Sequence, residues 1–565
     1  VGCTSATVAG SFQRWHLASR LALEMPGRQP KNEDAETGRS NESSPLIEKP
    51  REVSLLNPVQ WLQTLSQSYT WKLLAMVACT NHLLKGFVAG GGDEGLIGKP
   101  AEFLFAELGV SAGRLQALKA VAIIPFALKP LVALLSDAFP IAGYHKLPYV
   151  VIFTILSFAA LLTLGLGLAM SEAAVVTALF FAFLQVASVD VLMAAKSSEE
   201  VKKHAKLGPD FMTYTWLGIN AGQVLSVCFL GPVVAVLGPR APYCFAAPLV
   251  LAVLWPALGN FLGEQPVEPQ GWPAVFQQHK VLCRLTMLIG ALALFLVVST
   301  FTLPDVLLLE ISAGMATIVL ISFGIFIRWE IAGPVIFFFL LGLLNLNIDG
   351  ALFYFCTDDV MEFPAGPHFS PKFYITGLGG ATFLGITVGY ATGPALFKSW
   401  SYRRICIVTI LMRVVTQLAM VPLLRRSSFG VPDSLWLLVV MGLDSMVQAW
   451  RWIPKQVLAA HLAPKGVEAT CLGLHAGTFN MANILSSYCG SFILGYFKVS
   501  PRGAVLEAGK FDNLWKVQSL AAVLPLLLLF LVPVLVPKKA QTETLLEEQD
   551  DSATHNSIFE RLTQR

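Results

Sequence analysis

Long apolar segments separated by short polar loops dominate this chain. Of its 565 residues, 55% are hydrophobic and 14% are charged, whereas about a quarter of an ordinary soluble domain is charged. A helix of about 20 apolar residues crosses the roughly 30 Å hydrocarbon core of a bilayer, and counting such runs gives about 14 expected spans. The pattern therefore predicts an all-α polytopic membrane protein and excludes an isolated soluble domain.

The expected spans fall into groups of six, two and six. The first six lie in residues 71–263, two more in the linker 264–330, and the last six in 331–537. Two similar six-helix halves around a central site are typical of a duplicated carrier. The polar ends, 1–70 and 538–565, are predicted to be tails, the first of them disordered. The expected spans are 71–91, 112–136, 148–170, 172–196, 210–237, 241–263, 281–303, 305–329, 331–357, 372–397, 403–425, 433–461, 467–497 and 513–537.

Loop charges indicate the orientation in the membrane. Basic residues, with Lys455 counted among them, concentrate in the loops of one side, and the acidic loop 93–107 lies on the other side. The positive-inside rule then places both tails in the cytoplasm. Two loops, around Arg425 and around Lys498, oppose this assignment. The pattern leaves open whether the membrane is plasma or organellar.

Several classes of partner have no support in the sequence. The nine cysteines form no CxxC pair, and the net charge of +3 is small, so we expect no metal, no disulfide framework and no nucleic acid. A phosphate-binding GxxxxGK[ST] loop and paired metal-ligand motifs are missing as well, which argues against an ATP-driven pump or a membrane-embedded enzyme. We expect a monomer in a lipid bilayer that takes a small-molecule substrate and no cofactor.

Charged residues inside the expected spans mark the candidate path. A charge at the centre of a bilayer costs at least a few kcal/mol, so such residues usually face a cavity. Six such residues are the main candidates: Lys119, Lys129, Asp190, Asp349, Asp444 and Arg451.

Helical spacing groups some of these side chains. Asp444, Gln448 and Arg451 are spaced i, i+4 and i+7 and should share one helix face. Asn345 and Asp349 are spaced i and i+4, which predicts a second polar stripe. A carboxyl in a poorly hydrated site can exchange a proton near neutral pH. Asp190, Asp349 and Asp444 are therefore predicted to couple transport to protons, with structural ion pairs as the alternative.

A short loop after the second span carries a recognisable motif. Ser136-Asp137 is followed by Gly143 and the basic Lys146, which resembles the loop 2–3 signature of the major facilitator superfamily. Charges at facing helix ends can act as a latch that breaks and reforms. We predict Lys129, Asp137 and Lys146 as gate residues.

The fuller string resembles a more specific family. The segment contains Lys-Pro, Ser-Asp, Pro-Ile, Gly-Tyr and Pro-Tyr pairs between Lys129 and Tyr149, and further matching segments are 349–357, 464–470 and 511–515. These motifs are similar to the folate–biopterin transporter family. The resemblance covers residues 71–263 and 331–537, and it implies a major-facilitator fold and a proton-coupled or exchange carrier of folates or related pteridines.

The resemblance also suggests roles for single residues. A folate carries a dicarboxylate tail, for which Lys119 and Arg451 are natural partners. Asn345 and Tyr354 are assigned to substrate binding, Tyr354 by stacking on a pterin ring. Lys85 and His475 are expected to make packing or gate contacts.

Other readings of the same sequence stay open. The chain has Phe126 where the family commonly has Trp, and Asp190 is not followed by the acidic-Gly-basic-Tyr pattern of many members. A carrier of the same fold for another metabolite, such as S-adenosylmethionine or an amino acid, is the main alternative. A receptor that transports nothing is another.

Overall fold

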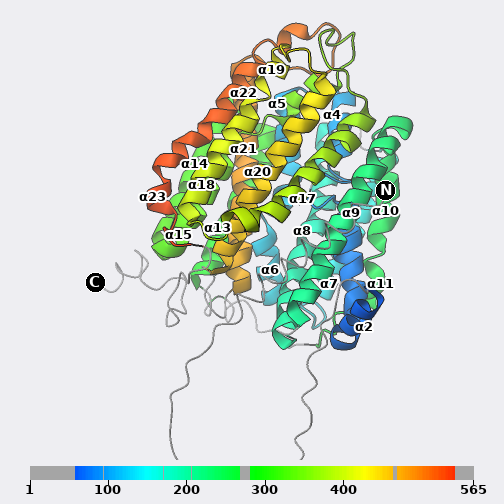
Figure 1. Cartoon of the computed structure of the whole chain (residues 1–565). Helices are drawn as coiled ribbons and strands as arrows, with labels where there is room; N and C mark the ends of the chain where they lie inside the picture. Colours follow the sequence, from blue (N-terminus) through cyan, green and yellow to red (C-terminus); the bar gives the residue numbers. More distant parts are fainter. Residues whose placement is uncertain are drawn as a thin grey trace, which may run out of the picture.

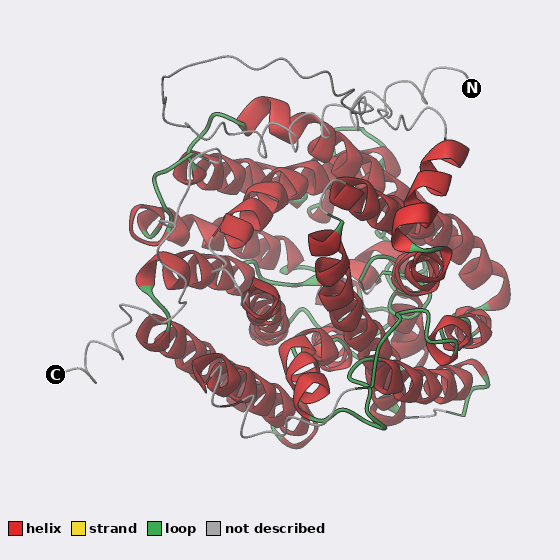
Figure 2. Ribbon diagram, turned by 90° about the horizontal axis from the view of Figure 1, so that it is seen from below, coloured by secondary structure: helices red, strands yellow, loops and turns green. Residues whose placement is uncertain are grey.

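The protein is a bundle of long helices. The computed structural model describes residues 58–92, 94–168, 171–204, 207–266, 276, 280–461 and 468–540. Within them every regular element is a helix and the rest is loop, as predicted (Figure 2). Figure 1 shows most helices running along one common axis, with α4 (Lys99–Glu107) near the top and α2 (Pro58–Tyr69) at the bottom. These two ends of the bundle are called the α4 end and the α2 end.

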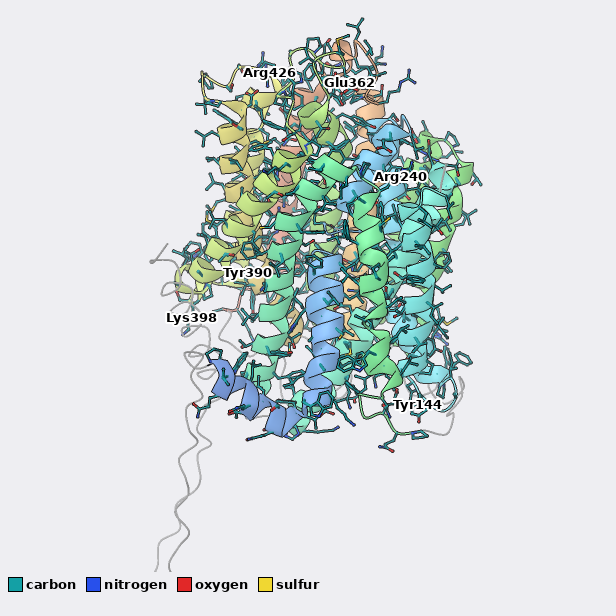
Figure 3. The ribbon with its side chains drawn as sticks, turned by 90° about the vertical axis from the view of Figure 1, so that its right-hand side faces the viewer. Tyr144, Arg240, Glu362, Tyr390, Lys398 and Arg426 are labelled. Atoms are coloured by element: carbon teal, nitrogen blue, oxygen red, sulfur yellow. The ribbon has the colours of Figure 1, made fainter. Side chains whose placement is uncertain are left out.

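Labelled side chains distinguish the two ends. Arg240, Glu362 and Arg426 lie towards the α4 end, and Tyr144 and Lys398 lie towards the α2 end (Figure 3). Arg426 thus lies at the opposite end of the bundle from Lys398. This agrees with the sequence analysis, in which the loop around Arg425 is one of the two basic loops on the side opposite to most basic loops.

The N-terminal half is built from helices that match the six spans expected there. Ser171 caps the longest of them, because its hydroxyl accepts a hydrogen bond from the Ala174 amide at 3.3 Å and so satisfies one otherwise unpaired amide. Between α2 and α4 lie α3 (Trp71–Val77) and η1 (Ala78–Val88). After α4 come α5 (Ala112–Ala122), η2 (Ile124–Phe126), α6 (Lys129–Ala138), α7 (Leu147–Gly165), α8 (Glu172–Lys203), α9 (Gly208–Leu237), α10 (Ala241–Leu251) and α11 (Leu254–Leu258).

The helical part begins earlier than expected. Residues 58–69, assigned to a disordered tail, form α2, because Trp61, Leu65 and Tyr69 recur on one face and are buried. Residues 1–57 and 541–565, which make up most of the two predicted tails, lie outside the described residues.

The remaining elements comprise an inserted pair and the C-terminal half. The inserted helices, α13 (Lys280–Thr302) and α14 (Asp305–Phe326), pack against α21 (Glu468–Tyr496). They also contact α5, α6 and α15 (Trp329–Leu344), so they lie along the seam between the halves. The elements are α13 (Lys280–Thr302), α14 (Asp305–Phe326), α15 (Trp329–Leu344), α16 (Asp349–Thr357), η4 (Phe373–Gly377), α17 (Leu378–Phe397), α18 (Tyr402–Leu418), α19 (Val421–Leu424), α20 (Asp433–His461), α21 (Glu468–Tyr496), η5 (Ala508–Lys510), α22 (Leu514–Val523), η6 (Leu524–Phe530) and α23 (Val532–Leu535).

Each expected span coincides with one or more helices. In the described part of the chain, nine helices are both long and apolar enough to cross a membrane. The total of about 14 spans stays a prediction, because several of the other segments are interrupted or more polar.

Several expected spans are interrupted, and two of the breaks lie beside candidate site residues. The segment 112–136 is divided into α5, η2 and α6 around Pro125 and Pro130, which lack the amide that a continuing helix needs. The segment 331–357 is divided at residues 345–348. Freed backbone groups at membrane depth are tolerated where side chains satisfy them.

Side chains from other helices satisfy the second break. The Ser486 hydroxyl donates to the Asn345 carbonyl at 2.8 Å and accepts from the Asn347 amide at 3.1 Å. Gln116 donates to the Asn347 carbonyl at 3.0 Å. The expectation that Asn345 and Asp349 share one helix face is therefore wrong, because the helix ends between them.

Candidate functional site

In the N-terminal half, one carboxylate bridges two lysines. Asp190 on α8 accepts from the Lys85 ammonium at 2.5 Å and from the Lys129 ammonium at 2.6 Å. The three side chains are 18%, 20% and 15% exposed, so they are neither fully buried nor on the surface. The group carries one net positive charge, and both of its lysines have a carboxylate partner.

Local helix geometry places these lysines. Lys85 lies in η1, a π-helical segment of the first span, and such wide turns occur frequently at functional sites. Lys129 begins α6, directly after the break in the second span. Aromatic rings lie beside both ammonium groups: Trp216 is 5.5 Å from Lys85, and Phe126 is 4.9 Å from Lys129.

In the C-terminal half, Asp444 on α20 accepts from several donors. Thr416 donates at 2.8 Å, Gln448 donates at 2.9 Å, and the Arg413 guanidinium lies 3.8 Å away. The predicted face of α20 is thus confirmed for Asp444 and Gln448, which contact each other. Arg413 on α18 has a larger part in this cluster than the sequence suggested.

Arg451 shares a small cavity with Arg413. Asn345 and Gln417 also line this cavity, together with apolar side chains of α18 and α22 and with Pro525. Among the described residues, Arg413 Nε and Nη1 are buried and have no hydrogen-bond partner. Buried donors without acceptors are costly. The cavity has room for about one water molecule, so an anion could supply the missing acceptors only if the cavity widens.

Lys119 is engaged by a carboxylate that the sequence analysis did not select. Glu102 on α4 accepts from Lys119 at 2.5 Å and lies 3.2 Å from Lys99. Burial alone would raise the pKa of Glu102, but the ammonium groups of Lys119 and Lys99 bring it below its ordinary value. The signal for Glu102 was weak, since it lies in a loop expected to be solvated.

Asp349 lies near the same cluster without joining it. Its side chain is exposed, it lies within electrostatic reach of Lys119 and Lys99, and its own amide donates to the Asn347 side chain at 2.9 Å. Tyr354 lies further along α16 and is fully buried, with its hydroxyl donating to the Val110 carbonyl.

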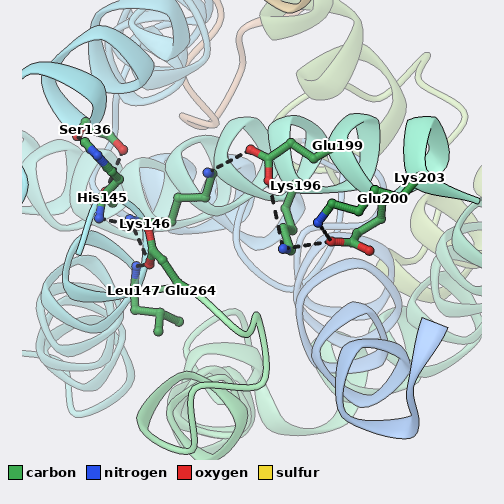
Figure 4. A network of polar contacts seen from close by, with 9 residues as sticks. All are labelled: Ser136, His145, Lys146, Leu147, Lys196, Glu199, Glu200, Lys203 and Glu264. Carbon is green, nitrogen blue, oxygen red and sulfur yellow. Dashed lines mark hydrogen bonds and ion pairs between the residues drawn. The ribbon is translucent and has the colours of Figure 1, made fainter. Parts of the chain in front are cut away.

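Of the three predicted gate residues, Lys146 forms an ion pair between helix ends at the α2 end. Lys146 pairs with Glu199 on α8 at 3.0 Å, and Lys196 pairs with Glu200 at 2.9 Å (Figure 4). The Lys129 ammonium instead belongs to the Asp190 group, and Asp137 is exposed in the last turn of α6.

A further carboxylate holds this gate loop. Glu264 accepts from the backbone amides of His145, Lys146 and Leu147 at 2.8 to 3.2 Å (Figure 4). These amides lie at the N-terminus of α7, where a carboxylate also stabilises the positive end of the helix dipole. Sequence reasoning missed Glu264, because it lies over a hundred residues away in the chain.

Lys455 was counted as a loop charge, and this is wrong. It lies within α20 and is only 4% exposed, one turn beyond Arg451. Over the parts of the chain that can be described, no group of three metal-binding side chains occurs.

Comparison with known proteins supports a carrier. The profile of the BT1 family matches residues 93–550. The probable folate-biopterin transporter 2 of Arabidopsis thaliana is 25% identical over 516 residues, which cover 87% of this chain and 90% of that protein. The folate-biopterin transporter of Synechocystis sp. is 24% identical over 464 residues, covering 78% and 79%.

Solved structures show the same fold at low identity. A POT family transporter in complex with a thioalcohol-conjugated peptide has a TM-score of 0.56 at 14% identity, covering 85% of this chain and 97% of that one. The inward-open xylose transporter XylE from E. coli has a TM-score of 0.51 at 14% identity, covering 86% and 98%. The chain therefore belongs to the BT1 family, the folate–biopterin transporter family that its motifs resemble, and it is a multi-pass membrane transporter of major-facilitator fold, not an enzyme.

Proposed function

We propose that this transporter carries an anionic pteridine, with folate as the first candidate, by alternating access of its two halves. Two relatives are named folate-biopterin transporters. The charge distribution inside the bundle supports an anionic cargo independently of those names.

The observation that carries the proposal is the cavity of Arg413 and Arg451. Two guanidinium groups face one carboxylate, Asp444, and Arg413 keeps two buried donors without acceptors. Guanidinium groups bind carboxylates through paired hydrogen bonds. A carboxylate of the cargo would supply the missing acceptors and balance the charge. The same excess of cations disfavours S-adenosylmethionine, whose sulfonium adds positive charge.

Contacts between the halves support alternating access. Gln116 on α5 donates to the Ser487 carbonyl at 2.9 Å, the Ala112 amide donates to the Pro501 carbonyl at 2.8 Å, and Thr376 donates to the Val227 carbonyl at 2.8 Å. These bonds join the halves towards the α4 end. We assign this arrangement to a state closed at the α4 end, with the α2 end and both tails in the cytoplasm.

Asp349 is the strongest of the three candidates for proton coupling. Asp190 lies between two ammonium groups, and Asp444 accepts from Thr416 and Gln448 beside Arg413, so both carboxylates are stabilised in their charged form. The Asp349 carboxylate makes no ion pair with any residue that the structure describes, so it can take up a proton without first losing an ammonium partner. We propose that Asp349 binds the coupling proton while Asp190 and Asp444 stay ionised.

Uptake into proteoliposomes tests both parts of the proposal. Labelled folate and biopterin are offered with and without an inward proton gradient, to wild type and to Asp349→Asn. We expect saturable folate uptake that rises with the gradient in wild type and ignores it in Asp349→Asn. Absence of folate uptake in wild type would refute the cargo, and a gradient response that persists in Asp349→Asn would refute the coupling role.

A further inference from the structure

Lys455 is a buried cation for which the proposed function has no use. Its ammonium lies 2.9 Å from the centre of the Phe479 ring, 4.6 Å from that of Trp452 and 5.7 Å from that of Phe338. No carboxylate of the described residues lies within ion-pair distance of it. Aromatic rings stabilise a cation only in part, whereas a buried charge ordinarily has a charged partner.

A second polar group beside Lys455 also lacks a partner. His475 on α21 lies against Phe338, with 6.3 Å between the ring centres, and its Nε2 atom is buried without a hydrogen-bond partner among the described residues. Lys455 and His475 lie within electrostatic reach of each other. Two polar groups at one place, without a hydrogen-bond partner among the described residues, indicate a site for a polar ligand.

The position of this site relates it to the Arg451 cavity. Lys455 follows Arg451 by four residues, so their Cα atoms lie about 6 Å apart along the same face of α20. Gln448, seven residues before Lys455, lies on the same face of α20 and is exposed. The two carboxylates of a glutamate are separated by a few single bonds and can reach two cations one helical turn apart.

Resting on the proposed function, we propose that Lys455 and His475 form a second carboxylate subsite that selects a dicarboxylate tail. Arg451 and Arg413 take one carboxylate, and Lys455 takes the other once the Phe479 ring moves off its ammonium group. Lys455 is then the residue that distinguishes a cargo with a glutamate tail from one without it.

Three related compounds test this assignment. Folate has the glutamate dicarboxylate, pteroate lacks the glutamate but keeps one carboxylate, and biopterin has none. Half-saturating concentrations are measured in proteoliposomes for wild type, Lys455→Met and Lys455→Arg. Lys516→Met is the matched control, because this exposed lysine also lies over an aromatic ring, 5.7 Å from the centre of Trp515.

We expect Lys455→Met to raise the half-saturating concentration of folate at least about tenfold, as for the loss of one charged hydrogen bond, with pteroate and biopterin changed less than about twofold. Lys455→Arg and Lys516→Met should keep the preference for folate over pteroate. Lys455→Gln serves as the neutral variant if Lys455→Met does not accumulate.

Two results would overturn the subsite. One is an unchanged preference for folate over pteroate in the neutral variants, and the other is an equal loss of all three compounds, which indicates a structural role. Both differ from failure of the proposed function, in which wild type itself takes up no folate.

Discussion

Removing the charge of Asp190 should destabilise the protein, because this carboxylate is the shared partner of two ammonium groups. The carboxylate contacts Lys85 at 2.5 Å and Lys129 at 2.6 Å. In Asp190→Asn, two ammonium groups stay close together without a counter-charge. Breaking a buried pair by removing one partner costs about 3–5 kcal/mol.

Partial exposure places the expected cost at the lower limit of that range. The three side chains are 15% to 20% exposed, and water screens charges at such positions to some extent. We therefore expect Asp190→Asn to lower the free energy of unfolding by about 3 kcal/mol, which is roughly a hundredfold change in the unfolding equilibrium.

A double variant separates charge balance from packing. Lys85→Met combined with Asp190→Asn restores the net charge of the group, so it should recover about 1–2 kcal/mol relative to Asp190→Asn alone. The assay is reversible chemical unfolding in detergent micelles, followed by tryptophan fluorescence. An Asp190→Asn protein as stable as wild type, or a double variant with purely additive loss, would show that the lysines do not depend on the carboxylate.

Three further outcomes follow from the structure. Gly350→Ala should disfavour the state closed at the α4 end by about 1–3 kcal/mol, because a Cβ at Gly350 overlaps the Ala112 carbonyl oxygen. Thiol labelling from the α4 end should therefore increase, and unchanged labelling would contradict this prediction. Burial, together with nearby Glu362, raises the pKa of Asp358 to about 8, so the stabilisation from its proton is complete below the ordinary value of 3.8 and is lost as pH rises through 8. Asp358→Asn should therefore remove part of the stability loss of wild type between about pH 4 and about pH 8, and parallel pH profiles of the two proteins contradict this. Glu264→Gln should cost about 1 kcal/mol, because the side chain would accept more weakly from the amides at the N-terminus of α7. Thermal unfolding measures this, with the exposed Glu107→Gln as control, and equal stability of the two variants counts against a capping role.

Hydrophobic length alone predicted the all-helical membrane architecture. Apolar runs at a helical spacing carry this information locally, so each expected segment coincides with a helix. The breaks within two segments were not predicted, because they depend on partners distant in sequence. Asn345 to Ile348 leaves the helix where Ser486 and Gln116 replace the lost backbone bonds.

The candidate site was predicted in part. Charged residues at membrane depth can be recognised in the sequence, because placing a charge there is costly. Asp190 forms an ion pair with Lys129, as the structural alternative for this residue predicted. Their partners were less visible. Glu102 and Lys455 lie near span ends, where a charged residue is ordinarily expected to be in a solvated loop. Both are buried in the structure, because other helices pack over them.

The central claim is that the positive interior of the bundle binds an anionic pteridine. Its most direct test compares labelled folate uptake by wild type, Arg451→Gln and Arg404→Gln in proteoliposomes. Arg404 is the matched control, because it is exposed at the start of α18. We predict saturable uptake by wild type and Arg404→Gln and a loss of at least about tenfold in Arg451→Gln. Equal uptake by all three proteins, or none by wild type, would contradict the account.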